Sequence, residues 1–223
     1  MATMYPQRLP PSGKSNAERK LFNLLRDHLS NDYTVIWSID WTVSRPASSG
    51  GGVRESEIDF LVLHPDKGIL VLEVKGGGVG YDGALHEWYS IDDDRRRHKI
   101  KDPFEQAKDG KYTLIRELTK QVPLPWLRIA CQNSVFGHAA VFPDIDGSRI
   151  ANRPTNQMRS FLTARICNPL PFSRQLIERT NFGDVALPCR SVRTPLQKSL
   201  RCMRQAGIFV RHLLTSLRMK RLN

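Results

Sequence analysis

Apolar residues recur every three or four positions in two stretches of the first two thirds of the chain, which is the spacing of one buried helix face. The first stretch covers residues 15–30 and opens on Ser15, a favourable N-cap. The second covers residues 102–122, where Asp102 suits the N-cap and Pro103 the first helical position. The pattern therefore predicts two amphipathic helices, each with one face against a core.

Between and after these helices the apolar residues form short runs of strand length, separated by Gly, Pro, Asn and Asp. The segment 42–56, which holds a Ser and Gly run, is predicted to be a flexible loop. Strands are predicted at 33–41, 58–63, 69–75, 126–133 and 137–143, with a further strand or turn at 85–91. The order of elements indicates an α/β fold, with a mixed sheet and helices packed on it.

Residues 58–75 read as a β-hairpin that turns about Asp66. In that register Asp59 lies opposite Glu73 on the neighbouring strand, and cross-strand neighbours have Cβ atoms about 5 Å apart. Because side chains alternate along a strand, Glu73 and Lys75 share one face and Ile58 belongs to the other. Both faces are apolar over most of their length, so we expect both to be buried.

Two carboxylates at the edge of a buried surface repel each other and lose hydration, which costs several kcal/mol unless a partner compensates. A divalent cation is such a partner, and hard carboxylate oxygens suit Mg²⁺ or Mn²⁺. Lys75 would then orient a water molecule or stabilise negative charge on an attacked phosphate. Asp59, Glu73 and Lys75 together favour phosphodiester hydrolysis, whereas the simpler interpretation is a solvated strand end.

The overall charge of +12 is unevenly distributed. Residues 1–148 hold 19 basic and 20 acidic side chains, and residues 149–223 hold 15 basic and 2 acidic ones. The basic tail, 148–223, has no sustained period, so we expect it to be irregular. It could bind DNA through counterion release, stay unfolded, or derive from a shifted reading frame.

The remaining composition argues for a cytoplasmic protein that is not inserted in a membrane. No run of 18 apolar residues is present, and residues 1–14, predicted to be a flexible lead-in, lack the features of a secretory signal. The four cysteines are widely spaced and contain no C-x-x-C pair, which argues against a zinc knuckle or a disulfide framework. The histidines at 64, 86, 98 and 138 show no metal-ligand spacing, so we expect them to be structural or surface residues.

The stretch "ESEIDFLVLHPDKGILVLEVKGG", with "SNAERKLFNLL" before it and "DPFEQAKDGKYTL" and "FGHAAVFPDID" after it, resembles the nuclease-related domain, NERD. This family is a branch of the restriction-endonuclease-like PD-(D/E)xK superfamily, and the resemblance covers residues 15–146. It implies an αβββαβ core at 15–147 and magnesium-dependent cleavage of DNA. The matching motif positions are Glu18, Asp59, Glu73 and Lys75. Ile58 stands where the superfamily name implies proline.

Other positions follow from this resemblance and from the hairpin. Gln106, at the start of the second helix, matches a further family position and would contact the substrate backbone or a metal-bound water. The carbonyl oxygen of Val74 would complete the metal shell, and Gly76 and Gly77 would let the nucleic acid approach the backbone. Glu18 is equally suited to a capping box with Ser15, and Gln106 to an amide satisfied at its helix start.

Two other functions remain open. The chain could be a noncatalytic DNA-binding accessory module, or a truncated fragment with no role of its own. Residues 4–12 are also similar to proteins in which the family's domain precedes a UvrD-like helicase, which makes a helicase a candidate partner.

Overall fold

The computed structural model describes residues 1–11, 15–44, 53–64, 67–121, 135–145 and 161–163. These residues form two helices and nine strands. In chain order they are β1 (Thr3–Tyr5), α1 (Asn16–His28), β2 (Thr34–Ser44), β3 (Val53–His64), β4 (Gly68–Val74), β5 (Gly78–Asp82), β6 (Glu87–Ile91), β7 (Arg97–Ile100), α2 (Pro103–Gln121), β8 (Val135–Phe142) and β9 (Phe161–Thr163).

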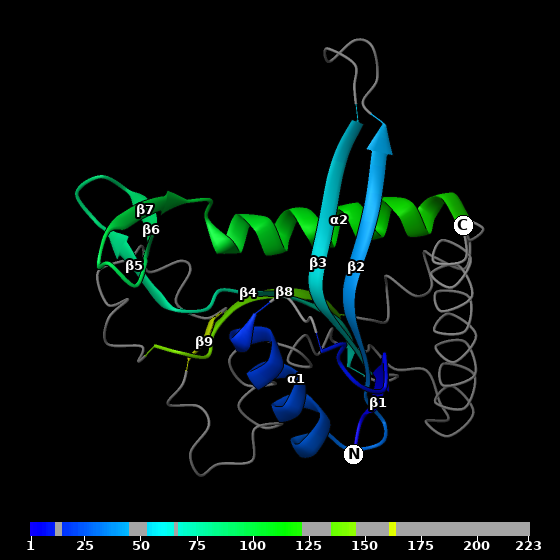
Figure 1. The fold of residues 1–223 in the computed structure, drawn as a ribbon. Coiled ribbons are helices and arrows are strands. Elements are labelled where there is room, and N and C mark those ends of the chain that lie inside the picture. The colour runs from blue at the N-terminus through cyan, green and yellow to red at the C-terminus, as the bar shows by residue number, and fades with distance from the viewer. Residues whose placement is uncertain (12–14, 45–52, 65–66, 122–134, 146–160, 164–223) are drawn as a thin grey trace, which may run out of the picture.

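Six strands form one mixed sheet in the order β1-β2-β3-β4-β8-β9. β3 is antiparallel to both of its neighbours, β2 and β4, whereas the pairs β1–β2, β4–β8 and β8–β9 are parallel. The two helices lie on opposite sides of this sheet, which gives three layers (Figure 1). The succession α1, β2, β3, β4, α2, β8 confirms the predicted αβββαβ core.

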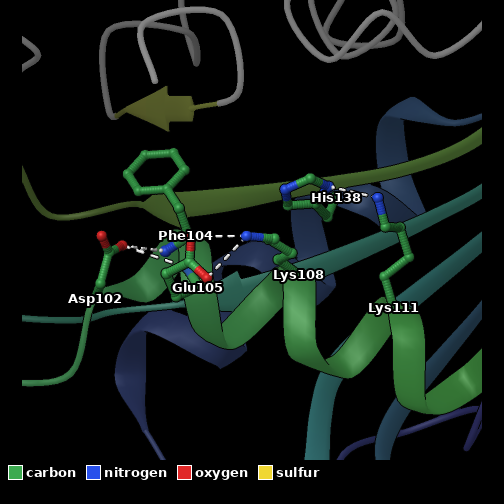
Figure 2. A network of polar contacts seen from close by, with 6 residues as sticks. All are labelled: Asp102, Phe104, Glu105, Lys108, Lys111 and His138. Atoms are coloured by element: carbon green, nitrogen blue, oxygen red, sulfur yellow. Dashed lines mark hydrogen bonds and ion pairs between the residues drawn. The ribbon is translucent and has the colours of Figure 1, made fainter. Parts of the chain in front are cut away.

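The start of both helices follows the sequence prediction. Ser15 accepts a hydrogen bond from the backbone N–H of Glu18 and so caps α1. Asp102 accepts from the backbone N–H groups of Phe104 and Glu105 and so caps α2 (Figure 2). Each cap satisfies N–H groups that have no partner inside the helix.

Two apolar layers hold the sheet between the helices. The layer on the α1 side joins the helix face at Ala17, Leu21, Phe22 and Leu25 to the strand residues Trp37, Phe60, Val62, Leu70, Leu72 and Val74. The layer on the α2 side joins Leu114 and Leu118 to Ile36, Ile39, Ile58, Leu61, Leu63, Ile69 and Val71. Full burial of each large apolar side chain stabilises the fold by roughly 1.5–3 kcal/mol. The prediction that both faces of the hairpin are buried is confirmed.

A separate three-stranded antiparallel sheet, β5-β6-β7, lies between β4 and α2 in the chain. Trp88 of β6 stacks on Phe142 of β8, with ring centroids 5.7 Å apart, and also packs against Phe104 of α2. The sequence predicted only one strand or turn here and missed β5 and β7. The charged residues 92–96 lie in an exposed turn between β6 and β7.

Three other expectations change. The segment 42–56 is not all loop, because β2 extends to Ser44 and β3 begins at Val53, and this ribbon reaches beyond α2 (Figure 1). The flexible lead-in was wrong for Thr3–Tyr5, which pairs with β2. The strand predicted at 126–133 lies outside the described residues, as does the tail apart from β9. Neither of the helices within the described ranges has the length and apolarity needed to cross a bilayer.

Candidate active site

The β3–β4 hairpin has the register that the sequence predicts. Phe60 pairs with Leu72, which places Asp59 and Glu73 at the next position, just beyond the paired part of the two strands. There the Asp59 side chain replaces the backbone hydrogen bonds between the strands. Its Oδ2 accepts a hydrogen bond from the backbone N–H of Val74 at 2.7 Å. Asp59 is thus fixed at the end of β4, next to the residues that flank Glu73.

The alternation of faces is interrupted at the same level. Ser38 of β2 has a φ of 51°, in the left-handed region, and falls between the paired positions Trp37↔Phe60 and Ile39↔Ile58. Ile58 packs in the α2-side layer and Phe60 in the α1-side layer, although strict alternation would put both on one face. The expectation from alternation, that Ile58 shares a face with Phe60, was therefore wrong.

Glu73 is a buried acid, with 6% of its surface exposed. Its Oε1 lies 2.8 Å from Nζ of Lys75, so the two side chains share a face as predicted. The backbone N–H of Lys75 donates to the carbonyl of Val141 on β8, which anchors the end of β4 on its other side. Loss of hydration raises the pKa of Glu73, and Lys75 opposes that rise.

Asp59 shows the strongest electrostatic perturbation of the site. Loss of hydration and then the nearby Glu73 raise its pKa to about 7, against the lowering effect of the Val74 N–H group. Glu18 adds to the rise at both Asp59 and Glu73. The acids are therefore close enough to repel one another, which a bound cation would relieve.

Glu18 comes to this group from α1 and is itself buried. Its Oε1 accepts from the hydroxyl of Ser15 at 3.0 Å, and its Oε2 accepts from the indole N–H of Trp37 at 2.8 Å. The side chain thus bonds to the N-cap hydroxyl and not to the N-cap backbone, so the capping box forms only in part. Trp37 was missed by the sequence analysis, because its strand carries no motif.

The glycines after Lys75 bring β4 against α1. A Cβ atom on Gly76 would lie 2.7 Å from Cβ of Ala17, so only glycine fits there without displacement. Gly77 has a φ of 71°, and its N–H donates to Oδ2 of Asp144 at 2.9 Å. Asp144 also pairs with Lys20 of α1. Asp144 is the second residue that sequence reasoning missed, although it lies within the stretch that resembles the family.

Gln106 is placed less directly. It lies in the first turn of α2, where its backbone N–H donates to the carbonyl of Asp102. Its side chain is partly exposed. No interaction in the described part of the chain joins it to the three acids, so its contact with substrate stays a prediction.

The carboxylates of the candidate site limit the kind of metal that it could hold. Within the described ranges no cluster of three or more His, Cys, Asp or Glu side chains is arranged to hold a metal. Mg²⁺, however, commonly takes only one or two carboxylates and completes its shell with waters and substrate phosphates. Asp59 and Glu73 could supply such a pair, and a cation there would relieve the repulsion from Glu73 that, after loss of hydration, raises the pKa of Asp59.

The described residues thus form an α/β domain with a mixed sheet of αβββαβ order, which carries two neighbouring acids and a lysine where two strands part. The family model for the nuclease-related domain, NERD, matches residues 13–139, more than half of the chain. The chain belongs to this family. A search of curated proteins and a search of solved structures each found no match.

Proposed function

We propose that this domain is a metal-dependent nuclease that hydrolyses phosphodiester bonds in DNA. The observation that carries the proposal is the buried Glu73. It forms an ion pair with Lys75 and lies near Asp59, where the pairing of β3 with β4 ends. A structural role alone would favour apolar residues at these positions, because burying two mutually repelling acids is costly.

Asp59 and Glu73 would hold Mg²⁺ or Mn²⁺, with the carbonyl of Val74 completing the protein ligands and Glu18 acting through a water. A bound ion of this kind lowers the pKa of its water and neutralises phosphate charge. Asp59 is oriented for this role by the Val74 N–H group, and Glu18 by Trp37.

Lys75 would leave its ion pair with Glu73 to bind the attacked phosphate or the attacking water. In the reaction the attacking water would give up a proton to solvent as its oxygen forms a bond to phosphorus, the bond from phosphorus to the leaving oxygen would break, and the leaving oxygen would take up a proton from solvent. Stabilising the added negative charge is the task that a lysine ammonium performs well. Gly76 and Gly77 would admit the DNA backbone beside Lys75, and Gln106 would contact it from α2.

Cleavage assays test this proposal. Linear, single-stranded and circular DNA would be incubated with the full chain and Mg²⁺, Mn²⁺ or EDTA. We expect metal-dependent cleavage that falls by about 10²–10³ in Asp59→Ala and Lys75→Ala. Asp94→Ala and Lys99→Ala, which change exposed residues of the β6–β7 region, are the matched controls. No cleavage by the wild type, or equal cleavage by all four variants, would reject the nuclease.

One observation favours a second candidate, a noncatalytic DNA-binding module. Lys75 already compensates Glu73, and Ser15 and Trp37 already satisfy Glu18, so part of the cluster is stable without metal. This candidate predicts DNA binding in EDTA with no cleavage under any metal condition. A helicase partner and a cytoplasmic location remain predictions from the sequence under either candidate.

A further inference from the structure

Two lysines of α2 lie nearly one turn apart on the flank of the helix that faces β8. Lys111 points to His138 of β8, and its Nζ is 3.2 Å from the ring Nδ1 (Figure 2). Lys108 lies next to it, towards the start of the helix, and pairs with both oxygens of Glu105 at 3.1 Å. Lysine, lysine and histidine from two elements thus form one polar cluster.

The cluster is rich in donors and poor in acceptors. Lys111 is partly buried, and among the described residues no acid forms an ion pair with it. Burial and then Lys108 lower the pKa of Lys111. Burial and both lysines also lower the pKa of His138 to about 4, against a small opposing effect of Glu105, so its ring is neutral at pH 7. With Nδ1 accepting from the Lys111 ammonium, Nε2 carries the ring proton and is a further donor.

An exposed aromatic ring adjoins these donors. Tyr112 is 56% exposed, and the Lys111 Nζ lies 4.7 Å from its ring centroid. Cations beside an exposed ring are what a single nucleic-acid strand needs, because the cations bind its phosphates while the ring stacks on a base. An inorganic anion has no base that could stack on the ring, so the ring favours a nucleic acid as the ligand.

The cluster is also close to the candidate active site. His138 pairs with Val71, and Glu73 follows two residues further along β4. Two residues of strand and one interstrand step separate the Cα atoms of His138 and Glu73 by about 8 Å. A nucleic-acid strand advances about 3.4 Å per nucleotide along its axis, so the two positions lie within about three nucleotides.

The geometry points to a phosphate-binding subsite at Lys111, His138 and Lys108, which holds a backbone phosphate of the nucleic acid a few nucleotides from the active site. This inference rests on the proposed function for its ligand. It assigns α2 a role that is separate from metal binding, namely to hold the nucleic-acid strand in position.

Lysine footprinting on the full chain tests the location directly. Amine labelling followed by mass spectrometry would be compared with and without a short single-stranded oligonucleotide, in EDTA so that no cleavage occurs. We expect at least a threefold protection of Lys111 and no protection of Lys99, a cation that is already paired with Glu87. Inorganic phosphate at the same phosphate concentration is the second arm, and equal protection by it would overturn the nucleic-acid assignment.

Binding measurements on variants give an independent readout. We expect Lys111→Met to weaken oligonucleotide binding roughly tenfold and to reduce the salt slope by about one. Lys99→Met removes the same charge and should change neither. Glu105→Gln releases Lys108 from its ion pair and should tighten binding, which a merely damaged fold would not do.

The outcomes separate this inference from the nuclease proposal, because binding is measured without metal. Protection of Lys111 and weaker binding of Lys111→Met uphold the subsite even if no DNA is cleaved. Active cleavage with an unprotected Lys111 upholds the nuclease and overturns the subsite. Equal affinities of Lys111→Met and Lys99→Met would also overturn it, as would a wild type that binds no oligonucleotide.

Discussion

Trp37 of β2 donates its indole N–H to Oε2 of Glu18 on α1 at 2.8 Å. The bond joins the first helix to the sheet and fixes the direction of a buried carboxylate that lies near Asp59 and Glu73. The candidate site thus depends on a tryptophan that belongs to no motif.

Replacing Trp37 by Phe removes this donor and leaves one carboxylate oxygen of Glu18 without its partner. We expect a loss of about 1–3 kcal/mol in the free energy of unfolding, measured by urea denaturation. Glu18→Gln and the double variant complete a mutant cycle. The double variant should be less destabilised than the sum of the single ones, and strictly additive losses would show that the contact contributes nothing.

Asp59→Asn should change how stability depends on pH. Because the pKa of Asp59 is raised to about 7, the folded state binds a proton more tightly than the unfolded state does. The stabilisation from this proton is complete below about pH 4 and is lost as the pH rises through about 7. Asparagine can still accept from Val74 but carries no charge.

In EDTA we therefore expect Asp59→Asn to match the wild type near pH 4 and to exceed its stability at pH 8 by up to about 4 kcal/mol. Urea unfolding across this range measures the difference. Magnesium at pH 8 should stabilise the wild type and leave the variant unchanged. A difference that is constant with pH would contradict the electrostatic account.

The close approach of Gly76 to Ala17 predicts a specific rescue. Gly76→Ala should destabilise the fold by about 1–3 kcal/mol, because its Cβ would lie 2.7 Å from Cβ of Ala17. Adding Ala17→Gly removes the clash, so the double variant should lose less than the two single variants together. Thermal unfolding measures all three.

Gly77→Ala is the matched control. Open space surrounds a Cβ at this position, but its φ of 71° is unfavourable for alanine. We expect a cost of about 1–2 kcal/mol that Ala17→Gly does not relieve. Rescue of both glycine variants, or of neither, would show that contact with α1 is not what excludes a side chain at Gly76.

The sequence was sufficient for the central elements because their signals are local. The helix at Asn16–His28 has both a periodic apolar face and a capping serine, and the register of Asp59 against Glu73 follows from the length of one hairpin. Alternation along β4 also placed Lys75 on the face of Glu73. These features depend only on residues near one another in the chain.

Features that depend on tertiary packing could not be predicted in this way. Ile58 departs from alternation at the level where β2 adopts a left-handed φ at Ser38, and no pattern in β3 reveals this departure. β5 and β7 are only five and four residues long, and both pair with β6, whose Trp88 packs on Phe142. The contact between Lys111 and His138 joins residues 27 positions apart.

Asp144 should act as a positioning residue for Lys75. Its Oδ2 accepts from the N–H of Gly77, two residues after Lys75, and its Oδ1 pairs with Lys20. Asp144→Ala frees that N–H, so the backbone that carries Lys75 gains freedom. We expect kcat for DNA cleavage to fall about tenfold with little change in KM, because a small misplacement of a catalytic group is costly.

Asp144→Asn can still accept from Gly77, and Lys20→Met removes only the ion pair, so both should keep nearly the full kcat. An equal loss of kcat in Asp144→Asn and Asp144→Ala would contradict this role. The charge of Asp144 would then matter, and its hydrogen bond with the N–H of Gly77 would not.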